Sequence, residues 1–183
     1  MNTIERRFWH YTPATRLPRI LASGKIKLDE QAKFYGEKPA AWVSTNPVWE
    51  NTATKPILDD SGKQVDLTKE EMSELMGLGR IEIKPSRDFI SWYKFRKTSG
   101  VHPKLWNGMT KYGLQVGANP NEWFASYIPI LDRYFISVEM FIQGKWIKCE
   151  DWSNILQFVL KGMEANNSPQ INSDLKNTLN KAA

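Results

Sequence analysis

Few residue types in this chain could perform chemistry, and their spacing narrows the choice. His10 lies between Trp9 and Tyr11, in a run of aromatic residues that is typical of a strand. A neutral imidazole donates one hydrogen bond and accepts another, so His10 is suited to holding a ribose hydroxyl group. The alternative interpretation is a histidine whose hydrogen bonds are satisfied inside the core.

Several common kinds of site are disfavoured. The two histidines are far apart in the sequence and Cys149 is the only cysteine, which argues against a zinc site. The chain has no G-x-S-x-G element of a serine hydrolase, no G-x-G-x-x-G and no P-loop. The eight tryptophans are unusual, because an indole suits a core and also a site that stacks on a base or a nicotinamide ring.

Hydrophobic patterning predicts several strands with helices placed irregularly between them. It predicts strands over 7–12, 25–30, 40–47, 80–85, 121–130 and 133–149, the last with a hairpin at Gln143-Gly144, and helices over 14–24, 48–55, 67–79 and 103–113. Thr68 and Glu71 form a capping-box pattern at the start of the third of these helices. Residues 57–66 indicate an exposed hairpin or loop, and 86–100 a loop with a short helix. The irregular order predicts an α+β fold with a mixed or antiparallel sheet.

Length and composition favour one domain over residues 1–165, followed by a polar tail, 166–183, that is a weak helix or disordered. A single cysteine excludes an internal disulfide and favours a reducing compartment. No secretory signal and no apolar stretch of about 20 residues is present, so we expect a cytoplasmic protein of a bacterium or a host cell that does not engage a membrane. The net charge of +5 is too small and dispersed to indicate a DNA-binding protein.

Five short segments carry a family resemblance when they are taken in order from residue 7 to about residue 145. They are His10-Tyr11-Thr12, Ile20-Leu21-Ala22-Ser23-Gly24, Ala41-Trp42-Val43-Ser44-Thr45, Asn51-Thr52-Ala53 and Asn121-Glu122-Trp123. This order resembles the ADP-ribosyltransferases, in particular the His-Tyr-Glu branch of the poly-ADP-ribose polymerases and diphtheria-type toxins.

Two departures from that branch are visible. Trp42 stands where the branch has a stacking tyrosine. Ser44-Thr45 is similar to the Ser-Thr-Ser element of the Arg-Ser-Glu branch, whose first strand carries an arginine, and here Arg6 and Arg7 come before the histidine. The chain mixes features of both branches, and the order of its segments favours the histidine branch.

The resemblance implies a fold of split mixed or antiparallel sheets with short flanking helices. It implies NAD as the substrate, without a metal, and a glycosyltransferase that moves ADP-ribose to a macromolecular acceptor, protein or nucleic acid. A bacterial or phage conflict factor, such as a toxin, would fit this activity.

The resemblance also implies residue roles. The carboxylate that stabilises the cationic ribose in the transition state is assigned to Glu122, with Glu139 in reserve and Glu50 as the third choice. His10, also placed in the catalytic set, holds the adenosine ribose, and the backbone at Tyr11 or Thr12 holds the nicotinamide amide. The remaining assignments are Trp42 with Trp49 around the nicotinamide ring, Ser44 and Thr45 at the nicotinamide or its ribose, and Lys55, Arg80 or Arg19 at the pyrophosphate.

Two alternatives stay open. One is a catalytically degenerate transferase fold that binds a nucleotide, a nucleic acid or a protein partner, because the aromatic and basic residues of 89–100 suit stacking and phosphate contact with a single strand. That segment is equally compatible with a substrate-recognition loop or plain surface. The other is a relative of the RNA 2′-phosphotransferases, whose arginine set the sequence does not reveal.

Overall fold

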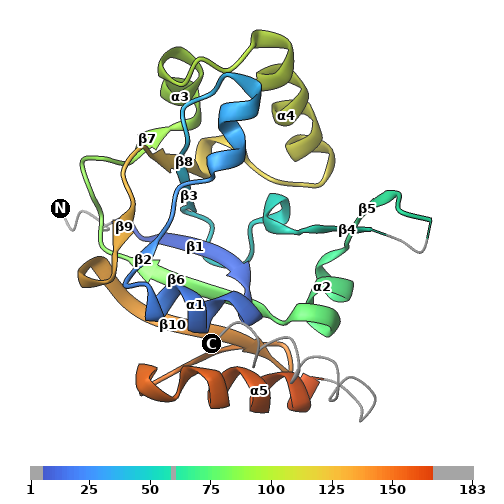
Figure 1. Ribbon diagram of the computed structural model, residues 1–183, viewed down its shortest axis with the longest axis vertical. Helices are drawn as coiled ribbons and strands as arrows, with labels where there is room; N and C mark the ends of the chain where they lie inside the picture. The colour runs from blue at the N-terminus through green and yellow to red at the C-terminus, as the bar shows by residue number, and fades with distance from the viewer. Residues whose placement is uncertain (1–5, 59–60, 167–183) are drawn as a thin grey trace, which may run out of the picture. The chain divides into compact units, whose positions relative to one another are not determined.

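The computed structural model describes residues 6–58 and 61–166, and its helices and strands alternate irregularly along the chain (Figure 1). The polar tail expected from residue 166 lies, apart from Asn166 itself, outside the described residues. The architecture is mixed α+β with a large antiparallel sheet, as the patterning predicts. Seven strands follow one another in the hydrogen-bonded order β11-β10-β6-β1-β3-β8-β7.

Contacts group the chain into two compact units, and each unit draws on three separate segments. Unit 1 contains residues 1–10, 24–52 and 82–136, and unit 2 contains residues 11–23, 53–81 and 137–183. Three strands contribute residues to both units: β1 (Phe8–Pro13), β6 (Leu78–Ile83) and β10 (Phe135–Ile142). The sequence predicts a single domain. Because segments of the two units alternate along the chain, no linker between them could be seen in the composition.

Unit 1 is built on a short antiparallel array of strands. β3 (Ala41–Ser44) pairs with β8 (Trp123–Ser126), which pairs with β7 (Ile90–Ser91), and Trp9 of β1 lies opposite Ser44. β2 (Lys25–Ile26) pairs separately with β9 (Ile130–Leu131). Short 3-10 helices complete the unit: η2 (Glu30–Tyr35), η3 (Asn51–Ala53, which extends into unit 2), η4 (Pro120–Glu122) and η5 (Asp132–Tyr134).

Two helices, α3 (Trp92–Thr98) and α4 (Pro103–Gln115), cover an aromatic core in unit 1. Ser91 accepts a hydrogen bond from the Lys94 N–H at the start of α3, and Pro103 occupies the first turn of α4, where no N–H partner is needed. The core includes Trp92, which stacks on Trp106 at 5.5 Å between ring centroids. The ambiguous segment 86–100 therefore forms a strand and a helix around buried rings.

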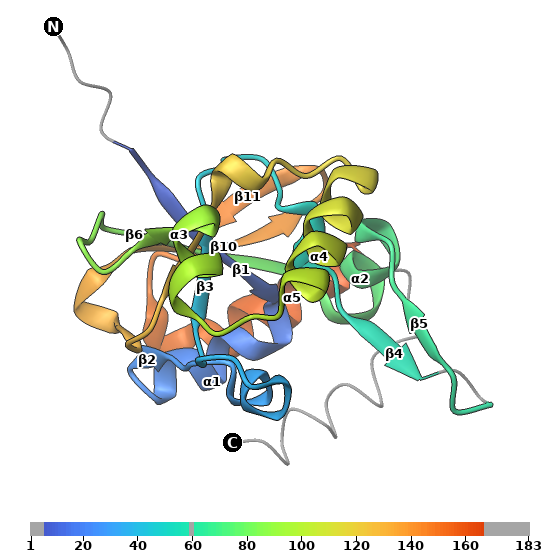
Figure 2. The same ribbon diagram turned by 90° about the horizontal axis from the view of Figure 1, so that it is seen from above.

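Unit 2 combines two hairpins with three helices. β10 pairs with β11 (Lys145–Lys148) through Gln143 and Gly144, whose positive φ angles of 47° and 81° fit the predicted two-residue turn. The helices are α1 (Leu17–Ala22), α2 (Lys69–Met76) and α5 (Ile155–Asn166), with 3-10 turns η1 (Ala14–Arg16) and η6 (Trp152–Asn154). β4 (Pro56–Leu58) and β5 (Gln64–Asp66) form a hairpin that extends away from α2 (Figure 2).

Three sequence expectations need correction. The strand predicted over 25–30 stops at Ile26, because Asp29 caps η2 through the Gln31 N–H. The helix predicted over 48–55 shrinks to the three residues of η3. No element was expected where α5 forms, although its buried residues recur at helical spacing: Ile155, Val159, Gly162 and Met163.

Candidate functional site

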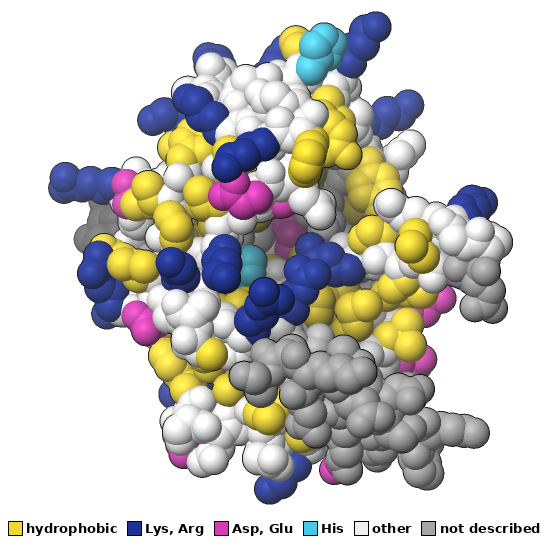
Figure 3. Space-filling view, viewed as in Figure 1, with side chains coloured by type: hydrophobic (Ala, Val, Ile, Leu, Met, Phe, Trp, Pro, Cys, Tyr) yellow, Lys and Arg dark blue, Asp and Glu magenta, His cyan; other side chains and the backbone are white. Residues whose placement is uncertain are grey.

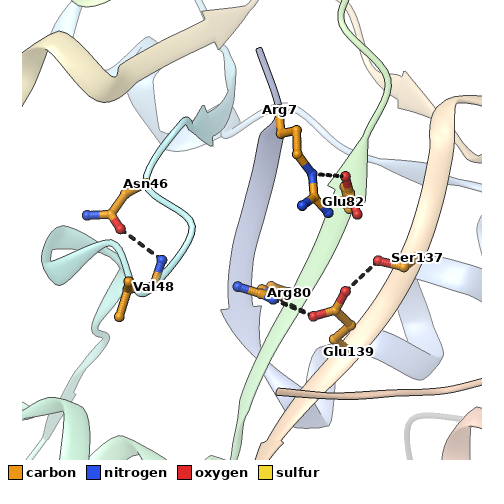
Figure 4. A network of polar contacts seen from close by, with 7 residues as sticks. All are labelled: Arg7, Asn46, Val48, Arg80, Glu82, Ser137 and Glu139. Atoms are coloured by element: carbon orange, nitrogen blue, oxygen red, sulfur yellow. Dashed lines mark hydrogen bonds and ion pairs between the residues drawn. The ribbon is translucent and has the colours of Figure 1, made fainter. Parts of the chain in front are cut away.

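The end of β3 and the turn that follows it bring an acidic side chain back to the strand. Ser44 Oγ accepts a hydrogen bond from the Asn46 N–H at 3.1 Å. The side-chain oxygen of Asn46 accepts one from the Val48 N–H at 2.9 Å (Figure 4). β3 ends at Ser44, and these two side-chain bonds then stabilise a turn that reverses the chain around Pro47. As a result Glu50, six residues after Ser44, accepts a hydrogen bond of 2.9 Å from the Ser44 hydroxyl group.

Glu50 is a buried carboxylate whose two oxygens are both engaged. Oε2 accepts from Ser44, and Oε1 accepts from the Thr52 hydroxyl group at 2.8 Å and the Thr52 N–H at 3.3 Å. The residue is 7% exposed, yet no Lys or Arg among residues 6–58 and 61–166 forms an ion pair with it. Buried carboxylates are usually paired with a cation, because desolvation of an isolated charge is costly. Glu50 is therefore a carboxylate that hydrogen bonds hold in place and that no cation of the described residues pairs with.

Two tryptophans flank Ser44 across the strands. Trp9 of β1 and Trp123 of β8 lie directly opposite Ser44 on its two sides, so all three side chains project to the same face. Trp123 is 8% exposed, and its Nε1 has no hydrogen-bond partner within the described part of the chain. A buried indole N–H without an acceptor costs free energy, and Trp123 is also part of the aromatic core around Trp92.

The C-terminal part of α4 supports this group. A Cβ atom placed on Gly113 would lie 2.5 Å from Cζ2 of Trp123 and 3.5 Å from Cγ2 of Thr52, so both side chains lie close to Gly113. Asn51 Nδ2 donates a hydrogen bond of 2.7 Å to the Val116 carbonyl oxygen, which anchors the segment that carries Glu50. We call Ser44, Glu50, Thr52 and Trp123 the Glu50 site.

A cation lies directly before β1, the strand that borders this site. Arg7 Nε lies 2.6 Å from Oε1 of Glu82, and the Arg7 guanidinium lies 5.1 Å from the Trp9 ring centroid (Figure 4). The Arg7 side chain is 59% exposed, so part of the guanidinium group faces solvent although it is paired with Glu82. The arginine that precedes His10 is thus held in place by a carboxylate and a ring.

The side chains of His10 and Trp42 point to opposite faces of the sheet. Because Trp9 lies opposite Ser44, strand alternation places Trp42 on the face of Trp9 and Ser44 and directs His10 to the other face. His10 Nδ1 lies 2.9 Å from the Trp42 carbonyl oxygen, a contact with the backbone of the neighbouring strand. The register therefore argues against the predicted pocket in which the imidazole and the Trp42 indole face one ligand.

The other predicted residues of unit 1 lie around the same turn. The Glu122 carbonyl oxygen accepts from the Thr45 N–H at 2.9 Å, but the half-buried Glu122 carboxylate has no hydrogen bond or ion pair within the described residues. Trp49 is buried beside Glu50. The acid predicted first, Glu122, is thus not held in position, whereas the third choice, Glu50, is held by three hydrogen bonds.

The remaining predicted residues belong to unit 2. Tyr11 and Thr12 are buried there, with the Tyr11 ring 5.9 Å from that of Trp146. Arg80 Nε and Nη2 lie 2.8 and 2.5 Å from Oε2 of Glu139, whose Oε1 accepts from Ser137 (Figure 4). Arg80 and Glu139 neutralise each other, which disfavours the pyrophosphate role of Arg80 and the reserve catalytic role of Glu139. Arg19 is exposed on α1 and Lys55 is half-buried.

A separate hollow of about 310 Å³ lies beside Trp42 in unit 1. Its apolar wall includes Trp42, Phe95, Leu105 and Met109. Its polar lining includes Asp29, Gln31, Glu37 and Lys38. Burial, and secondarily the charge of Asp29, raise the pKa of the Glu37 carboxyl group. Trp42 and Ser44 are two residues apart on one face of β3, so the hollow and the Glu50 site are about 7 Å apart along the strand.

Comparison with known proteins adds no family to these observations: no family model, curated protein or solved structure matches the chain. Within the described residues, no group of three or more His, Cys, Asp or Glu side chains is arranged to hold a metal ion. None of the described helices combines the length and the apolar character that crossing a membrane requires.

The sequence contained a signal for the Glu50 site that the prediction ranked too low. The stretch from Ser44 to Thr52 combines an Asn-Pro turn with donors on both sides of an acid. Ser and Asn side chains that bond to nearby N–H groups favour a tight reversal. The expected helix over 48–55 would have pointed Glu50 away from Ser44, and that expectation concealed the pairing.

Proposed function

We propose that this chain is an NAD-dependent ADP-ribosyltransferase with an ADP-ribosyltransferase-like fold, and that Glu50 is its catalytic carboxylate. The observation that carries the proposal is a buried carboxylate that is fixed by three hydrogen bonds and forms no ion pair with a Lys or Arg in residues 6–58 and 61–166. The order of the resembling segments from residue 7 to about residue 145, and the antiparallel sheet, support the choice of reaction.

The chemistry explains why such a carboxylate is useful. When the bond between nicotinamide and C1′ of the ribose breaks, its electron pair leaves with nicotinamide and neutralises the pyridinium ring. Positive charge then develops on C1′ and the ring oxygen of the ribose, and a carboxylate that is already oriented stabilises it without reorganising. An acceptor nucleophile attacks C1′ and loses its proton.

Neighbours of Glu50 have roles in this reaction. Ser44 and Thr52 donate hydrogen bonds to Glu50, which fix the direction of its carboxylate. Arg7 supplies positive charge for the pyrophosphate. This assignment replaces Glu122 by Glu50 and gives Arg7, not Arg80, the phosphate role.

The test is nicotinamide release from NAD by purified protein, followed by chromatography. We expect Glu50→Gln to lower the rate about 100-fold or more, a loss typical of removing a group that stabilises developing charge. Glu122→Gln is the matched control, since it removes one carboxylate from the same unit, and its rate should stay within about twofold of the wild type.

Three outcomes separate the alternatives. Release that survives Glu50→Gln but disappears in Glu122→Gln returns the catalytic role to Glu122. Saturable NAD binding without release by the wild type supports the catalytically degenerate module instead. An absence of both NAD binding and release contradicts the proposed function.

A further inference from the structure

The two helices over the aromatic core of unit 1 form a surface with one sign of charge. Residues 89–121 contain no Asp or Glu. They contain five basic residues, all exposed: Lys94, Arg96, Lys97, Lys104 and Lys111. In Figure 3 the region of α3 and α4, at the top of the view, shows dark blue side chains without magenta ones. The five basic residues of α3 and α4 thus carry as much net positive charge as the whole chain, which has a net charge of +5.

These cations are available to a partner. None of the five forms an ion pair with a carboxylate within the described residues. The Arg96 guanidinium lies 4.6 Å from the Trp106 ring centroid, which restricts its motion while the residue stays exposed. α3 and α4 pack on the stacked rings of Trp92, Phe95 and Trp106, so the basic side chains project from a rigid base.

Aromatic and apolar side chains are interspersed with the cations. Tyr93, between Trp92 and Lys94, is 48% exposed. Leu105 and Met109 are exposed on α4, and both line the hollow of about 310 Å³. An acidic protein partner would need only the cations of this surface. A single-stranded nucleic acid also needs flat apolar surfaces on which its unpaired bases can stack.

We propose that the α3–α4 surface binds single-stranded nucleic acid, with phosphates on the basic residues and bases on Tyr93 and in the hollow. The hollow suits a splayed base because Trp42 and Phe95 provide rings, and the carboxylates of Asp29 and Glu37 accept hydrogen bonds from exocyclic amino groups. This binding is independent of NAD and goes beyond the proposed transferase activity.

The experiment is fluorescence anisotropy of labelled 20-nucleotide strands of DNA and RNA with the full-length protein in the absence of NAD. The test variant is Lys94→Gln/Arg96→Gln/Lys97→Gln. The control, Lys145→Gln/Lys148→Gln/Lys161→Gln, removes the same charge from exposed positions of unit 2. We expect the test variant to bind at least tenfold more weakly and the control to stay within about twofold.

Three further arms identify the partner. The slope of log affinity against log salt should fall by about 2 in the test variant, since each phosphate contact contributes about 0.7 for a single strand. A strand of the same length with abasic sites should bind at least tenfold more weakly, because it cannot stack. Tyr93→Ala should weaken binding about tenfold and leave the salt slope unchanged.

Four results would overturn the proposal: no saturable binding, equal losses in the two triple variants, tighter binding of a duplex than of either single strand, or equal binding of a poly-glutamate peptide. Whether DNA or RNA binds more tightly identifies the natural strand. Loss of nicotinamide release leaves this test unaffected, because no arm uses NAD.

Discussion

Gly113 connects the stability of α4 to the Glu50 site, and its replacement by alanine gives a sharp test of the packing there. Alanine in a helix interior normally stabilises by about 1 kcal/mol relative to glycine. At Gly113 the new methyl group would meet Cζ2 of Trp123 at 2.5 Å, and its Cη2 more closely still. Real Cβ atoms do not approach carbon atoms this closely, so the helix or the indole must move.

Neither element moves easily. Trp123 packs edge-on against Trp92, with 5.3 Å between ring centroids, and Trp92 is stacked in turn on Trp106. Overpacking in such a core costs about 1–3 kcal/mol. Gly108 is the matched control, because it lies in the same helix and a methyl group there would have nothing within 4 Å. Both variants gain the same helix propensity. The difference between their free energies of unfolding therefore measures the cost of the steric overlap with Trp123.

We expect Gly108→Ala to raise the free energy of unfolding by about 1 kcal/mol. Gly113→Ala should lie about 1–3 kcal/mol below Gly108→Ala, or about 3–9 °C lower in Tm for a domain of this size. Urea unfolding followed by circular dichroism measures both. Equal stabilisation by the two substitutions would refute the packing of Trp123 against α4, and with it the wall of the Glu50 site.

Three other predictions concern residues outside that site. Thr68 donates hydrogen bonds from its backbone N–H and its hydroxyl group to Glu71, which lowers the pKa of that carboxyl below 4.5. The stabilising effect is present above pH 4.5 and lost as the pH falls below it, so the Tm difference between wild type and Thr68→Ala should shrink from pH 6 to pH 3. Burial raises the pKa of the Cys149 thiol, so Ellman's reagent at pH 8 should modify the folded protein at least tenfold more slowly than the protein in urea. The side chains of Arg80 and Glu139 are 11% and 12% exposed, so Arg80→Met should cost about 2–4 kcal/mol in urea unfolding and Arg80→Met/Glu139→Leu less, whereas additive losses would deny the pairing.

Local signals in the sequence predicted much of the fold. The capping box of Thr68 and Glu71 and the Gln143-Gly144 turn are decided by side chains within three residues of each other, and both form as expected. Long-range pairing could not be predicted in this way. α5 depends on packing against α1 and α2, which are far away in the sequence, and the strands shared between the two units depend on pairs that no spacing rule reveals.

The candidate site was likewise predicted only in part from the sequence. Ser44 was selected from the sequence for its type and its strand position. The acid that it holds was ranked third by its position in the chain, and the side-chain bonds of Asn46 that bring it to Ser44 were not predicted. Glu122 was ranked first on segment order alone, and order says nothing about which carboxylate finds donors. Hydrogen-bond satisfaction of a buried charge is a property of the folded chain.

Calorimetric titration with NAD⁺ and NADH tests the central claim most directly, because the two ligands differ by the positive charge on the nicotinamide ring. If Glu50 provides unneutralised negative charge at this ring, the wild type should bind NAD⁺ about 2 kcal/mol, or about thirtyfold, more tightly than NADH. Glu50→Gln should lose that preference and retain affinity for NADH. Equal affinities of the wild type for both ligands, or a preference that survives Glu50→Gln, would contradict the account.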